Sequence, residues 1–155
     1  MSLHFEDGFH LVVKRDCPTC KLIEPEIRKL VESGDFGQNL RIYIQDDPSY
    51  LSDLSQSVSD ASLESSYRLK IETVPTLIRF ENGEETSRSV GWVRKEWSQL
   101  LKEPMFGEHL PESRPGCGSL TVMPGVKETL DARFSVLHLN SRTIEIGEFD
   151  DPIEQ

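Results

Sequence analysis

The fold is best indicated by the segment Phe9-His10-Leu11-Val12-Val13-Lys14-Arg15-Asp16-Cys17-Pro18-Thr19-Cys20. Its first half is a compact apolar run rich in β-branched residues, which is typical of a buried strand. Pro18 suits the first turn of a helix, and apolar residues then recur at helical spacing. We therefore predict a strand over residues 9–14 and an amphipathic helix over residues 18–33, bent at Pro25.

The same patterns predict the other elements of the first hundred residues. Alternating apolar and polar side chains indicate a strand over residues 40–45, so the first strand, the helix and this strand form a parallel β-α-β unit. The segment 49–66 is rich in Ser and Asp and has a thin apolar pattern, from which we expect one or two marginal helices. Residues 76–90 indicate a hairpin with an Asn-Gly turn, and residues 93–101 a final helix.

The composition changes beyond Pro104, where Pro and Gly residues crowd the chain as far as Gly125 and exclude long regular elements. After this loop we expect a short helix over residues 126–134 and a hairpin with strands over 135–139 and 143–146. Such a tail is too short to support a core of its own. We therefore predict a main domain over residues 1–103, and a C-terminal extension over residues 104–155 that packs on the main domain or on a partner.

Charge and hydropathy exclude several classes of function. The chain has 17 basic and 27 acidic residues, a formal net charge of −10 that repels nucleic acid and anionic membranes. No apolar run approaches the length needed to cross a bilayer. The N-terminal residues lack the basic region and apolar stretch of a secretory signal, so we expect a cytoplasmic protein.

Cys17 and Cys20 are the candidate catalytic residues. The predicted strand-to-helix junction places Cys17 at a helix N-terminus, where unpaired amide hydrogens and the macrodipole favour negative charge. A free cysteine has a pKa near about 8.5, and in such motifs this falls to between about 3.5 and 7.5. Cys17 is thus the expected nucleophile, and Cys20, one helical turn further on, is the expected resolving thiol for a mixed disulfide on Cys17.

These motifs resemble the thioredoxin family over about residues 8–102. The resemblance is carried by the strand before the cysteines, by the helix proline, and by the motifs Cys17-Pro18-Thr19-Cys20-Lys21 and Val74-Pro75-Thr76-Leu77-Ile78-Arg79-Phe80-Glu81-Asn82-Gly83-Glu84, with Gly91 after the last strand. It implies an α/β protein with a minimal thioredoxin-like fold, in which a four-stranded mixed sheet is flanked by helices. It also implies a thiol-disulfide oxidoreductase that uses a redox-active disulfide and no cofactor or metal.

The resemblance further assigns a substrate groove beside the dithiol. Pro75 is expected to be cis, and the residues expected to bind an extended substrate chain are Val74, Pro75, Thr76, Pro18 and Thr19. The implied partners are a protein disulfide substrate and an unidentified reductase.

The sequence also departs from thioredoxins proper around the cysteines. Asp16 replaces their tryptophan, Pro18-Thr19 replaces their Gly-Pro pair, and Leu11 stands where they keep a buried acid. The charge of Asp16 disfavours a thiolate on Cys17, whereas basic neighbours favour it, so the direction of the redox potential stays open. These basic neighbours are Lys14, Arg15 and Lys21.

Alternatives remain for each cysteine. Cys17 and Cys20 have a spacing that also suits half of a zinc site, which Cys117 and one of His10, His109 or His138 would complete. Cys117 lies in a polar, glycine-rich setting, as an incidental thiol or as one that exchanges with the main pair or with another protein. The alternative to an enzyme is a non-catalytic interaction module whose dithiol senses redox state.

Overall fold

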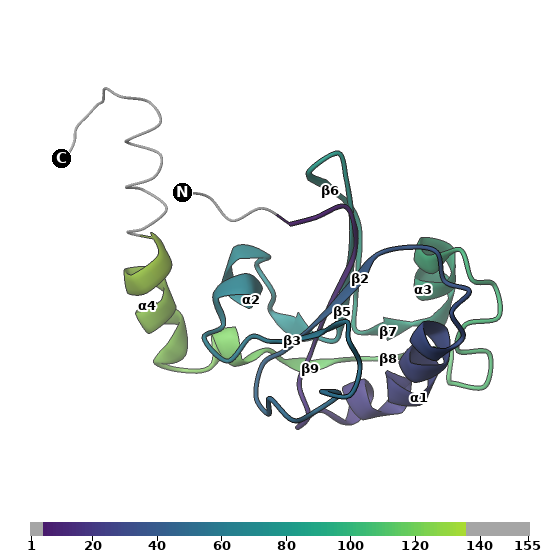
Figure 1. The fold of residues 1–155 in the computed structure, drawn as a ribbon. Helices are drawn as coiled ribbons and strands as arrows, with labels where there is room; N and C mark the ends of the chain where they lie inside the picture. Colours follow the sequence, from purple (N-terminus) through teal and green to yellow (C-terminus); the bar gives the residue numbers. More distant parts are fainter. Residues whose placement is uncertain (1–4, 136–155) are drawn as a thin grey trace.

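The computed structural model describes residues 5–135, and a five-stranded mixed sheet forms its centre (Figure 1). The strand order is β3-β2-β1-β5-β6. β1 is parallel to β2, β2 is parallel to β3, and β5 runs antiparallel to both β1 and β6. The strands are β1 (Gly8–Val13), β2 (Leu40–Ile44), β3 (Ser57–Ser59), β5 (Thr76–Glu81) and β6 (Glu84–Val90).

Helices cover both faces of this sheet. In Figure 1, α1 and α3 lie on one side of the strands and α2 and α4 on the other. The helices are α1 (Pro18–Glu32), α2 (Glu64–Arg68), α3 (Arg94–Leu101) and α4 (Val126–Leu130), and a π-helical turn (Asp131–Ser135) continues α4. The sequence predicts a mixed sheet flanked by helices, and the described residues form one.

β1 is the central strand of the sheet and contributes buried apolar side chains to both of its faces. Leu11 and Val12 are fully buried and point to opposite sides of the sheet, as successive residues of a strand must. On one side, α1 contributes Ile23 and Ile27 to the core. The helix continues through Pro25, so the proline does not end it. A smaller apolar cluster of Leu63, Leu130 and Phe134 joins α2 to α4.

Two sequence predictions need correction in this part of the chain. The sheet has five strands instead of four, because Ser57–Ser59 pairs in parallel with β2. Segment 49–66, expected to contain one or two helices, consists of turns, β3 and only the start of α2. The backbone pairing of β2 with β3 therefore decides the structure of a segment whose own apolar pattern is weak.

The chain beyond Pro104 returns across the body of the protein. β8 (Ser113–Arg114) pairs with β7 (Trp92–Val93), and β9 (Cys117–Gly118) pairs with β4 (Thr73–Val74). We call residues 113–121 the strap. It runs in green along the lower part of Figure 1 towards α4.

The hairpin predicted near the C-terminus lies outside the described residues, apart from Ser135 in the π-helical turn. Among the described residues, every helix is too short or too polar to span a bilayer.

Candidate functional site

Cys17 occupies the N-cap of α1, at the junction that the sequence predicts. Its backbone is extended, and its Sγ accepts a hydrogen bond from the amide of Cys20 at 3.1 Å. Pro18 follows at the first helical position, where its missing amide hydrogen costs nothing. The first turn of α1 contains no acidic side chain that would compete for the exposed amides. The helix end therefore offers its unpaired N–H groups to the sulfur of Cys17.

This environment lowers the pKa of Cys17 to about 6. The largest cause is a hydrogen bond from the Cys20 thiol. A second hydrogen bond from the Cys117 thiol and the amides of Cys20 and Thr19 add to it, while burial opposes them. Cys17 is therefore largely an anion at neutral pH, because the donors around it outweigh the loss of solvent.

Cys20 has the opposite character. Burial, before all else, raises the pKa of Cys20, and its hydrogen bond to Cys17 and the nearby charge of Cys17 raise it further. Only 1% of its surface is exposed. The pair thus consists of one stabilised thiolate and one protonated thiol that donates to it. That asymmetry suits a nucleophile and a resolving thiol.

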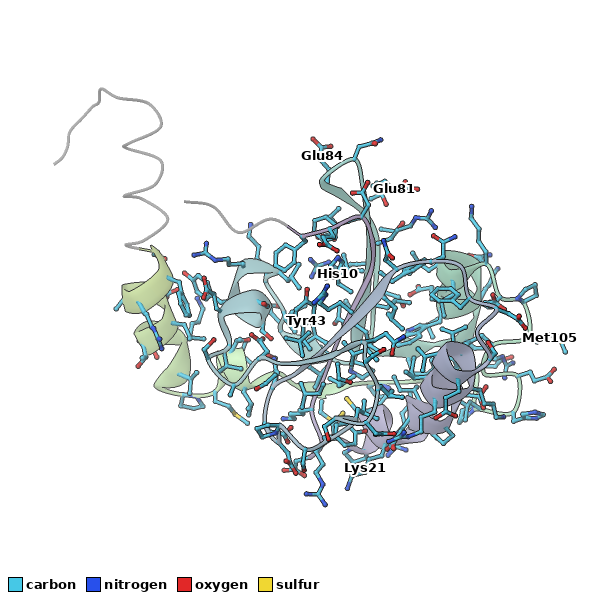
Figure 2. All side chains as sticks on the ribbon, in the orientation of Figure 1. His10, Lys21, Tyr43, Glu81, Glu84 and Met105 are labelled. Carbon is cyan, nitrogen blue, oxygen red and sulfur yellow. The ribbon has the colours of Figure 1, made fainter. Side chains whose placement is uncertain are left out.

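The loop before Cys17 is held by the carboxylates of Asp46 and Asp47, which lie just after the end of β2. Asp46 accepts hydrogen bonds from the amides of Arg15 and Asp16 at 2.8 and 3.0 Å. The guanidinium of Arg15 pairs with Asp47 at 2.7 Å. Of the basic neighbours, Lys21 points outward from α1 (Figure 2), whereas Lys14 is buried and reaches the strap.

The segment Val74-Pro75-Thr76 lies beside the dithiol, and its first peptide bond is cis. The carbonyl oxygen of Val74 lies 3.7 Å from Sγ of Cys17. The hydroxyl of Thr76 donates to the carbonyl of Thr73 at 2.7 Å, within the same turn. All three residues of the segment are buried.

The strap covers the place where the resemblance puts the substrate chain. Cys117 is the register partner of Val74 in the β4–β9 pair. The hydroxyl of Thr19 donates to the carbonyl of Pro115 at 2.7 Å, and Nζ of Lys14 donates to the carbonyl of Gly118 at 2.7 Å. Of the residues predicted to bind substrate, Val74 and Thr19 are therefore already bonded to the strap.

A buried polar network fixes the far end of the strap. The Gln45 amide donates to Ser119 Oγ at 2.7 Å and to Ser66 Oγ at 2.9 Å, and it accepts from the amide of Leu120 at 3.0 Å. Thr121 donates to the carbonyl of Ile71 at 2.6 Å. Because these groups are shielded from water, each lost partner would be costly.

The residues proposed as zinc ligands do not form a metal site in the part of the chain described. Within residues 5–135, no group of three or more His, Cys, Asp or Glu side chains is arranged to hold a metal ion. His10 lies inside the protein, bonded to Tyr43 and to the carbonyl of Glu6 (Figure 2). His109 is exposed beside Glu108, and His138 lies outside the described residues.

The sequence predicts that Cys17, Cys20 and Val74 lie together, and it leaves open whether Cys117 is an incidental thiol or one that exchanges with this pair. The structure places Cys117 beside Val74 and the dithiol. The placement of buried Lys14 against Gly118 was not predicted. One signal was present: glycines flank Cys117, and small residues allow two backbones to approach closely. At Gly116 a Cβ would collide with the carbonyl oxygen of Val74.

Comparison with known proteins gives a structural neighbour and no sequence relative. No family model matches the chain, and no curated protein matches it. Among solved structures, the pneumococcal exposed lipoprotein thioredoxin Etrx1 from Streptococcus pneumoniae is similar, with a TM-score of 0.49 and 14% sequence identity. The match covers 61% of this chain and 82% of that protein.

Proposed function

We propose that this protein is a thiol-disulfide oxidoreductase that exchanges disulfides with a protein substrate through Cys17 and Cys20. The observation that carries the proposal is the position of Cys17 at the N-cap of α1, with the amide of Cys20 3.1 Å from its Sγ. Together with the Cys20 thiol, this geometry favours a thiolate at neutral pH, the form that attacks disulfides.

The reaction proceeds in two exchanges. The thiolate of Cys17 attacks one sulfur of the substrate disulfide, forms a mixed disulfide and expels the other sulfur as a thiolate. Cys20 then loses its proton to solvent and attacks Cys17, which releases the second substrate thiolate and leaves a Cys17–Cys20 disulfide. The substrate gains two electrons, the protein loses two, and an external thiol reductant restores the dithiol. Both steps use sulfur chemistry alone.

The test is catalytic reduction of insulin by dithiothreitol, measured as the turbidity of the released chains. We expect turnover with the wild type and the uncatalysed rate with Cys17→Ser. Met105→Ser is the matched control, because it also replaces a sulfur-containing side chain by serine. Met105 is 65% exposed at the periphery of the molecule (Figure 2). A wild-type rate equal to that of Cys17→Ser would refute catalysis.

A second function is favoured by one observation, the burial of both thiols. Cys17 and Cys20 are each 1% exposed, so a protein substrate has no direct access to them while the strap is docked. A non-catalytic interaction module, with the dithiol as a redox-sensing latch beneath the strap, would have this property. In the same assay that module gives no turnover, although its Cys17–Cys20 disulfide still forms reversibly.

A further inference from the structure

The strap brings a third thiol to the dithiol. Cys117 pairs with Val74, whose carbonyl oxygen lies 3.7 Å from Sγ of Cys17, so both cysteines adjoin the same residue. Two hydrogen bonds to strap carbonyls, from Thr19 and Lys14, fix the chain on either side of Cys117. Cys117 is therefore held beside Cys17 by backbone pairing and by anchors, not by a chance side-chain contact.

The three thiols differ in their access to solvent. Cys17 and Cys20 are buried, whereas Cys117 is partly exposed. With the strap docked, an external thiol or disulfide meets Cys117 first. A disulfide held between Cys17 and Cys20 lies out of its reach.

The charges around Cys117 change when Cys17 is oxidised. In the reduced protein, burial is the main cause that raises the pKa of Cys117, and its hydrogen bond to Cys17 and the negative charge of Cys17 raise it further. Both effects of Cys17 disappear once that sulfur is part of a disulfide. The positive charge of Lys14, which lowers the pKa of Cys117, remains. Oxidation of the buried pair thus favours the thiolate of Cys117.

We propose that Cys117 is a relay thiol that carries the disulfide from the buried pair to the protein surface, an inference that rests on the proposed function of Cys17 and Cys20. The Cys117 thiolate attacks Sγ of Cys17, a Cys17–Cys117 bond forms, and the Cys17–Cys20 bond breaks. Cys20 leaves as a thiolate and takes up the proton that Cys117 lost. This step moves no electrons in or out of the protein.

The surface disulfide is then open to a small thiol or a protein thiol. The external thiolate attacks Sγ of Cys117 and expels Cys17, whose low pKa makes it the better leaving group of the two. A second external thiol frees Cys117. In sum, two external thiols become one disulfide, and Cys17 and Cys20 return to the reduced state.

The first experiment tests whether the relay bond forms. Cys20→Ser is treated with glutathione disulfide, quenched with acid and mapped by mass spectrometry without reduction. For Cys20→Ser we expect the mass of the protein to fall by two hydrogen atoms and a peptide to link Cys17 to Cys117. A stable glutathione adduct on Cys17 should appear only in the double variant Cys20→Ser/Cys117→Ser. Stable glutathione adducts on Cys20→Ser, without the linked peptide, would overturn the proposal.

The second experiment tests whether the bond is used. Wild type and Cys117→Ser, each oxidised to the Cys17–Cys20 disulfide, are reduced by glutathione while the remaining disulfide is followed by mass spectrometry. We expect Cys117→Ser to react at least about tenfold more slowly, because it loses an intramolecular step. Cys117→Ala should be reduced as slowly as Cys117→Ser. Equal rates in all three proteins would overturn the relay.

The two proposals fail differently. If wild type and Cys117→Ser both reduce insulin and form the Cys17–Cys20 disulfide, and both turn over at the same rate, the relay fails and the oxidoreductase stands. If wild type gives no insulin turnover, the oxidoreductase fails, whatever bond Cys20→Ser forms.

Discussion

Val74 and Cys117 are register partners in the antiparallel pair of β4 and β9. Because the carbonyl oxygen of Val74 also lies 3.7 Å from Sγ of Cys17, this one residue joins the strap to the dithiol. The strap is consequently part of the site and not a separate appendage. Substitutions in the strap should therefore change the reactivity of Cys17, and oxidation of the dithiol should change the reactivity of Cys117.

The first prediction concerns the ionisation of Cys17. Its pKa of about 6 means that the rate of alkylation of Cys17 by iodoacetamide should reach half of its plateau near pH 6. The measurement is peptide mass spectrometry after timed quenching, which separates Cys17 from the other two cysteines. An ordinary thiol has its midpoint near about 8.5. A Cys17 midpoint at that value contradicts the stabilised thiolate.

The second prediction ranks the groups that lower the pKa of Cys17. The Cys20 thiol is the largest cause and the Cys117 thiol is a smaller one. Cys20→Ala should therefore raise the alkylation midpoint of Cys17 more than Cys117→Ala does. The two variants serve as controls for each other, since each removes one sulfur donor. The reverse order would mean that Cys117 is the main donor to the thiolate.

The third prediction concerns pH and stability at His10. Nε2 of His10 donates to the carbonyl of Glu6 at 2.7 Å, and Nδ1 lies 2.9 Å from the hydroxyl of Tyr43, which donates to it when the ring is neutral. Burial is the main cause that lowers the pKa of His10 below its ordinary value of 6.5. Below pH 6.5 the unfolded chain binds the proton first. The free energy of unfolding should therefore fall as the pH drops, until the pKa of the folded state is passed.

This contribution can be isolated by urea unfolding between pH 7.5 and 5.5. His10→Gln lacks the titrating group, so its free energy of unfolding should decline less over that range than that of the wild type. Parallel declines in the two proteins would show that His10 makes no contribution to the pH dependence.

The fourth prediction concerns the Gln45 network. Gln45→Leu leaves the amide of Leu120 without its buried acceptor, while Ser119 loses the donor Gln45 but keeps Thr121. An unsatisfied buried amide costs about 1–3 kcal/mol, so the urea midpoint should fall clearly. Gln99→Leu is the matched control on an exposed face of α3 and should change little. Equal midpoints for Gln45→Leu and wild type would rule out a structural role for this network.

Local sequence patterns predicted the elements whose buried residues recur with the period of a strand or a helix. β1 and α1 lie where their apolar spacing predicts, and so does the junction that holds Cys17 and Cys20. The short strand β3 was not predictable, because Ser57–Ser59 has no apolar alternation and is defined by pairing with β2.

The pairing of the strap with β4, at the site itself, was not predictable from the sequence either. β4 and β9 are two residues long, which is too short for any periodic signal. Their pairing depends on contacts between residues far apart in the chain, such as the bond from Lys14 to Gly118. The sequence could therefore offer exchange with the main pair as one alternative for Cys117, but it could not decide between this and an incidental thiol.

The last prediction tests whether the strap controls access to Cys17. At Gly116 an added Cβ would collide with the carbonyl oxygen of Val74 and lie 2.6 Å from Cγ2 of Thr73, so Gly116→Ala must push the strap away from β4. A destabilisation of about 1–2 kcal/mol raises the population of the open form about fivefold to thirtyfold. The alkylation rate of Cys17 at pH 8 should rise by a similar factor, because the open form is the one that reacts. Gly118→Ala is the matched control on the other side of Cys117, where nothing lies within 4 Å of an added Cβ. If both variants alkylate at the wild-type rate, the strap does not limit access, and the burial of Cys17 must be overcome by another movement.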